Sequence, residues 1–172
     1  MKNYYLLFSL FFPLQSIQAQ VMPEQRVAKA IYVEALGSGI GLSLNYDTRF
    51  KPGLTGLGLR VGVGGISGSG DQSRVTLISL PVLVNYVIGN SRVSFESGLG
   101  VMASYVTAAG KDAVTGDYAT AQGAGISVAG NFGLRLQPKQ NGVHFRLYWS
   151  PFITDHGLQP QWLGLSLGYG FR

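Results

Sequence analysis

The sequence predicts an all-β protein, an eight-stranded antiparallel up-and-down transmembrane β-barrel preceded by a cleavable signal peptide. Three observations lead there: an alternating C-terminus, a composition rich in glycine and poor in charge, and an export leader. In residues 162–172 the large side chains fall on alternate positions, namely Leu163, Leu165, Leu167, Tyr169 and Phe171. Because successive strand residues point to opposite faces, one face is apolar and the other has almost no side chains. That pattern is typical of a strand with lipid outside and a narrow lumen inside.

The composition supports a membrane environment. Glycine accounts for 25 of 172 residues, and charged residues for only 12%, against roughly 25% in ordinary soluble domains. Few charges are left to solvate a surface, while 46% hydrophobic residues exclude a disordered chain. Cysteine is absent, which excludes disulfides, thiol chemistry and a lipidated cysteine anchor.

Residues 1–19 read as a secretory signal peptide, with a mature domain over 20–172. Lys2 precedes an apolar run too short to span a bilayer, and Ala19 offers a small residue for cleavage. The alternative is a buried first helix. No later segment approaches the ~20 apolar residues that a transmembrane helix needs. We therefore expect an outer-membrane or periplasmic protein.

Alternation and turn signals divide the rest of the chain into eight strands. The expected spans are 30–37, 39–47, 56–66, 75–88, 92–106, 124–137, 143–154 and 161–171. Compact turns at 49–53, 90–92 and 139–142 alternate with looser loops at 67–74, 107–123 and 155–160, except that the first outer connection, at 37–39, is short. In bacterial barrels short turns face the periplasm and long loops face outside. Pro81 removes a ladder hydrogen bond and suggests a bulge or distortion.

Period two assigns an uncharged outward stripe to every strand from the second onward. Aromatic residues lie on these stripes near the short-turn end, where an interfacial girdle belongs. The predicted girdle consists of Tyr46, Tyr86, Phe95, Phe145, Tyr169 and Phe171.

The opposite parity places charged residues in the lumen. The candidate network consists of Glu34, Arg60, Glu96, Arg135 and Arg146, with Asn45, Asn85 and Asn131 as polar companions. An eight-stranded barrel is only just wide enough for side chains to fill, which favours an internal salt-bridge plug. The alternative is a selectivity ring or gate. Towards the outside the lumen positions are small, which leaves a shallow vestibule that Met102, Tyr148 and Phe152 partly fill.

The remaining charges are sorted between the two ends. The short-turn end is basic, with Asp47 and Arg49 among its turn charges, and the outer loops are mostly acidic. A sequence pI near 9.6 could suggest nucleic acid, but no stacking platform or binding motif accompanies it. We expect contacts with inner-leaflet lipid phosphates or, alternatively, simple solubilising charge.

Several segments resemble the small eight-stranded bacterial outer-membrane β-barrel proteins. They include residues 32–37, 43–46, 59–62, 80–86, 95–100 and the closing 163–171. The resemblance implies location in the cell outer membrane and insertion by the barrel-assembly machinery, with Tyr169 and Phe171 as the assembly signal. Such signals usually end on an aromatic residue, whereas Arg172 follows Phe171 here. Similar proteins include adhesins, channels, stability proteins and lipid A enzymes, so the resemblance alone selects no function.

No catalytic or metal-binding residue is predicted. His144 and His156 have no serine at a motif spacing, the His-x-Ser arrangement of lipid A deacylases is absent, and no metal-ligand spacing occurs. We therefore expect a monomer without cofactor, with a structural or surface-interaction role that presents the loops 67–74, 107–123 and 155–160. The alternative is a narrow channel for small solutes or hydrophobic compounds.

Overall fold

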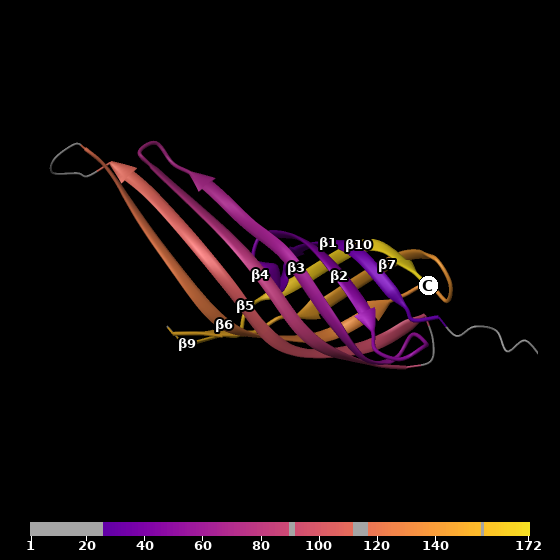
Figure 1. The fold of residues 1–172 in the computed structure, drawn as a ribbon. Coiled ribbons are helices and arrows are strands. Elements are labelled where there is room, and N and C mark those ends of the chain that lie inside the picture. The colour runs from indigo at the N-terminus through magenta and orange to yellow at the C-terminus, as the bar shows by residue number, and fades with distance from the viewer. Residues whose placement is uncertain (1–25, 90–91, 112–116, 156) are drawn as a thin grey trace, which may run out of the picture.

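The computed structural model describes residues 26–89, 92–111, 117–155 and 157–172, so the predicted signal peptide and His156 lie outside the described residues. Eight antiparallel strands close into the predicted ring (Figure 1). They are β1 (Lys29–Leu36), β2 (Leu42–Arg49), β3 (Gly56–Ser69), β4 (Ser73–Ile88), β5 (Val93–Lys111), β6 (Tyr118–Leu136), β7 (Gly142–Trp149) and β10 (Leu163–Phe171). Each strand pairs with the next, and β10 closes the ring against β1. Within the described ranges, no helix has the length and apolarity to cross a membrane.

The predicted strand 143–154 is one strand with an interruption. After β7, the short strand β8 (Phe152–Thr154) resumes pairing with β6 in the register that β7 left, and forms a hairpin with β9 (Gly157–Gln159). At the break, the Ser150 hydroxyl donates to the Gly130 carbonyl, and the Gly130 amide donates to the Pro151 carbonyl. The backbone therefore leaves the regular ladder for two residues without a register shift.

Strands β3 to β6 continue well beyond the ring as a four-stranded sheet (Figure 1). The prediction that 67–74 and 107–123 are loops was wrong for most of their length. Strands β5 and β6 pair without a break as far as Lys111 opposite Tyr118. Alanine, glycine, serine and threonine differ little in polarity between the two faces of a strand, so the sequence shows no alternation here. The backbone ladder continues nevertheless. We call this sheet, residues 65–78, 103–111 and 118–126, the extension.

Of the two predicted effects of Pro81, a bulge or a distortion, the structure shows the second, a local gap in pairing. Strand β4 pairs continuously with β5 through Pro81, but the pairs opposite Gly62 and Val63 of β3 are missing. The β3–β4 register is the same on both sides of that gap. The absent proline N–H therefore falls on the β3 side and costs local hydrogen bonds only.

The first outer connection lies at 37–39 as predicted, but it is longer than the short link expected between strands 30–37 and 39–47. Strand β1 ends at Leu36, β2 begins at Leu42, and Gly37–Gly39 form the 3-10 turn η1, which is completely buried. Leu36 and Ile40 flank it at φ of 61° and 47°, a region that side-chain-bearing residues rarely adopt. The turn is therefore folded into the mouth of the barrel.

The barrel is apolar outside and polar inside. Large apolar side chains of every strand of the ring face outward, and some are very exposed, such as Leu42 and Leu99 at 64%. Most buried residues among those described are polar or charged. The proposed girdle residues Tyr46, Tyr86, Phe95, Phe145 and Tyr169 are all exposed on this outer face, and Phe171 is half-buried. This arrangement is the reverse of a soluble domain and suits a hydrocarbon surrounding.

Candidate functional site in the barrel interior

The charged side chains predicted for the lumen are brought together there. Glu34, Arg60, Glu96, Arg135 and Arg146 come from β1, β3, β5, β6 and β7, and each is at most 2% exposed. Period two places them inside because every neighbour in sequence is an outward-facing or small residue. The predicted Arg/Glu network is therefore present.

Two further charges, missed by sequence reasoning, belong to the same network. Asp47 and Arg49 were expected among the turn charges, but β2 runs to Arg49 and both side chains are buried. They share the parity of the interior residues Ser43 and Asn45. Continuing the alternation past Asn45 for two more steps, to 47 and 49, would have found them. The nearby Pro52-Gly53 turn signal hid those steps.

The ion pairs join all these groups into one alternating chain. Its order is Arg49, Asp47, Arg135, Glu96, Arg146, Glu34 and Arg60. Asp47 Oδ1 lies 2.7 Å from Arg49 Nη2 and 2.9 Å from Arg135 Nη2. Each carboxylate therefore stands between two guanidinium groups, and both ends of the chain are arginines.

The other two carboxylates complete the series. Glu96 Oε2 accepts from Arg135 Nη1 at 3.1 Å, and Glu96 Oε1 accepts from Arg146 Nη2 at 2.5 Å. Glu34 Oε2 accepts from Arg60 Nη2 and lies 3.8 Å from Arg146 Nη1. Buried charges are tolerated when they are paired and hydrogen-bonded in this way, while removal of one partner is costly.

Polar side chains connect the remaining strands to this chain. Asn85 of β4 donates to Asp47 Oδ2 at 2.6 Å and to Glu96 Oε1 at 3.1 Å. Ser166 of β10 donates to Glu34 Oε2 at 3.4 Å, so all eight strands of the ring contribute a side chain. The rings of Tyr32 and Tyr148 lie against the guanidinium of Arg146, with centroids 4.9 and 4.6 Å away. Aromatic faces thus cover cation surface that water would otherwise solvate.

The turn η1 and aromatic side chains lie buried in the outer half of the lumen. The Gly39 amide donates to Glu34 Oε1 at 3.4 Å, and Trp162 Nε1 donates to the Gly37 carbonyl at 2.7 Å. Phe152 meets Trp162 edge-on with ring centroids 5.4 Å apart. Met102, Tyr148 and Phe152 are buried as expected, but Ile40, Trp162 and η1 also occupy the space foreseen as a vestibule. Sequence periodicity could not place an irregular turn.

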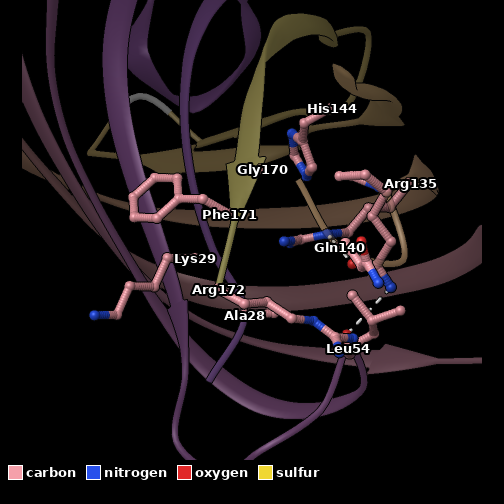
Figure 2. Close-up of a pocket in the computed structure, with 11 residues that line it drawn as sticks. Ala28, Lys29, Leu54, Arg135, Gln140, His144, Gly170, Phe171 and Arg172 are labelled. Carbon is pink, nitrogen blue, oxygen red and sulfur yellow. Dashed lines mark hydrogen bonds between the residues drawn. The ribbon is translucent and has the colours of Figure 1, made fainter. Parts of the chain in front are cut away.

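A small recess lies at the short-turn end below the network. Figure 2 shows His144, Gln140 and Arg135 grouped on one side of β10, with Phe171 and Lys29 pointing to the other. The free volume of about 10 Å³ is room for one water. His144 stacks on Tyr32 at 5.3 Å, and neither of its ring nitrogens bonds to a protein atom in the described part of the chain. Across the described ranges, no group of acidic, histidine or cysteine side chains is arranged to hold a metal ion.

Comparisons with known proteins identify the fold. No family model matches the sequence, and no curated protein sequence matches it significantly. Among solved structures, a major outer membrane protein of Thermus thermophilus aligns with a TM-score of 0.58 at 16% identity, covering 85% of this chain and 99% of that one. The N-terminal β-barrel domain of Pseudomonas aeruginosa OprF aligns with a TM-score of 0.54 at 13% identity, covering 84% and 96%. The chain therefore has the fold of the small eight-stranded barrels of bacterial outer membranes.

Proposed function

We propose that this protein is an integral outer-membrane barrel with a structural or surface-interaction role, and that its lumen is closed to solutes. The observation that carries the proposal is the alternating chain from Arg49 to Arg60, which links the strands across the interior. Every charged side chain of this network has an oppositely charged partner, and the Gly39 amide of η1 donates to Glu34 Oε1. The barrel is then a closed scaffold.

The outer-membrane location is supported by the exposed face of the ring. Soluble monomers rarely expose contiguous apolar patches beyond a few hundred Å². Here an uninterrupted outward belt includes Ile31, Leu44, Val63, Leu99 and Leu147, each about half exposed or more. Lipid contact would satisfy this belt, and the similarity of fold to outer-membrane proteins agrees with it.

The surface role is supported by the extension. Its strands carry the chain past the ring, so the turn 70–72 would stand clear of the lipid headgroups if the short turns face the periplasm (Figure 1). Because the sequence has no cysteine, single cysteines can report this orientation. Asp71→Cys should react with an impermeant maleimide on intact cells, while Lys51→Cys, in the turn between β2 and β3, should not. The reverse pattern would invert the barrel and remove the surface role.

The runner-up function is a narrow channel, for which the polar interior gives a specific reason. A selectivity ring also needs charged side chains in the lumen, and Arg135 and Arg146 are available there. Planar-bilayer recording of the refolded wild type separates the two functions. A closed scaffold gives no steady current, whereas steady single-channel steps would establish the channel and refute the structural role.

A further inference from the structure

One groove at the short-turn end combines cationic and apolar walls. It has a volume of about 470 Å³ and lies beside the turn between β6 and β7. Arg92 and Lys139 supply its charge, Gln140 and Asn141 line it as neutral amides, and none of the lining residues is acidic. The Gln137 amide donates to the Arg92 carbonyl at 2.8 Å, which ties the two sides of the groove together.

The groove opens onto the outer face of the barrel. Leu136 and Val143 line it and are 40% and 61% exposed. In the ladders Leu136 stands opposite Phe145, and Val143 stands opposite Tyr169, so the apolar wall continues into the predicted girdle. An acyl chain that follows this wall would stay against apolar surface while its headgroup remained at the two cations.

The surroundings favour an anionic occupant. The exposed charged side chains at this end of the described barrel are all basic: Arg26, Lys29, Lys51, Arg92 and Lys139. A soluble anion would leave Leu136 and Val143 without a contact, whereas a phospholipid would contact both the cationic wall and the apolar wall of the groove. A cationic side chain near an anionic membrane surface contributes about 1 kcal/mol, or about fivefold in affinity.

We propose that this groove is a binding site for one anionic phospholipid of the membrane leaflet that the short turns face. The phosphate lies between Arg92 and Lys139 with the amides of Gln140 and Asn141 as donors, and an acyl chain runs along Leu136 and Val143. This inference rests on the proposed membrane location, but its test separates the two.

The test uses the refolded full-length mature chain in detergent micelles, with phosphatidylglycerol bound and counted by native mass spectrometry. The wild type should retain one phosphatidylglycerol in preference to phosphatidylcholine. Lys139→Gln should weaken the apparent affinity about fivefold, and Arg92→Gln with Lys139→Gln about thirtyfold. The matched control, Lys29→Gln with Lys51→Gln, removes two charges at the same end outside the groove and should change it less than about twofold.

Three results would overturn the site. If the control pair loses as much affinity for phosphatidylglycerol as the groove variants, the attraction is diffuse and electrostatic. If the wild type retains phosphatidylcholine equally well, the headgroup charge is not recognised. If millimolar inorganic phosphate displaces the lipid, the groove is a free-phosphate site. Heat-modifiable gel migration reports the barrel separately for every variant. If the double variant folds as a barrel and binds lipid as the wild type does, the lipid site is refuted and the membrane proposal stands. If the wild type never partitions into micelles or vesicles, the membrane proposal itself is refuted.

Discussion

Glu96 forms ion pairs with two buried guanidinium groups, those of Arg135 and Arg146. Removal of its charge would take one carboxylate partner from each of them. Glu96→Gln keeps the shape and removes the charge, so Arg135 and Arg146 are stranded in a space that water does not reach freely. We expect a loss of about 3–5 kcal/mol in the free energy of unfolding. Urea unfolding of the refolded protein, followed by tryptophan fluorescence, measures it. Asp71→Asn, in the exposed turn after β3, is the control and should stay within about 0.5 kcal/mol.

Asp47 gives a prediction that its sequence position alone would not suggest. It lies next to a turn, yet it joins Arg49 to Arg135 and accepts from Asn85. Asp47→Asn should therefore destabilise the barrel by about as much as Glu96→Gln, about 3 kcal/mol or more in the same assay. A loss no larger than that of Asp71→Asn would mean that this end of the chain is hydrated and contributes little.

For single residues, the sequence predicts which side chains face the interior wherever a strand is regular. Glu34 and Arg146 follow from parity alone, because each sits between outward-facing residues. Asp47 and Arg49 were missed because they lie close to Pro52 and Gly53. Charged residues near a Pro-Gly pair indicate a turn more strongly than two further steps of alternation indicate a strand. Partner choice was also beyond the sequence, since which carboxylate meets which guanidinium depends on the stagger of the ring.

The turn η1 is the element on which the proposed closure of the outer mouth depends. Gly37 has φ of +59°, and a Cβ there would lie 2.6 Å from the Tyr148 hydroxyl oxygen and against the Glu34 carboxylate. Gly37→Ala should therefore cost about 1–3 kcal/mol in urea unfolding. Gly68→Ala is the matched control, since a Cβ at that position of the extension meets nothing within 4 Å. Equal stability of the two variants would show that η1 is not held in the mouth.

The closing strand β10 carries the second prediction for an element. Phe171 stands opposite Lys29 of β1 at the end of the seam that shuts the ring. Phe171→Ala should lower the folded fraction in outer-membrane preparations by removing an aromatic from the predicted girdle and assembly signal. Deletion of Arg172 should be tolerated. Heat-modifiable migration on gels reports the folded fraction, and normal insertion of a chain lacking residues 161–172 would contradict the architecture.

Element boundaries show where sequence reasoning lost its signal. Strand β10 was placed within two residues because large and small side chains alternate in it without a break. The ends of β5 and β6 were placed well short of their true positions, because Ala108, Ala109 and Ala121 look alike on either face. The conformation of the connection at 37–39 could not be predicted, since Leu36 and Ile40 adopt a backbone region that their residue types disfavour.

In the molecule as a whole, the ring and the extension have different proposed roles. In the ring, an apolar outer belt suits contact with lipid, and the buried interior is ion-paired, as the proposed closed scaffold requires. The extension, whose strands leave the ring on one side only, raises the far ends of β3 to β6 above it (Figure 1). The cationic groove at the opposite end would hold the barrel to its inner lipid layer. These parts together support the proposed surface-exposed scaffold.

Conductance across a planar bilayer tests the closed lumen most directly. The refolded wild type should show no steady current at any ordinary holding potential, because the alternating chain and η1 fill the interior. The combined variant Arg60→Ala, Arg135→Ala and Arg146→Ala removes three guanidiniums from that chain and should permit brief, flickering openings. A wild type that already conducts steadily, with ion selectivity reversed when the same arginines become glutamates, would contradict closure and establish a channel.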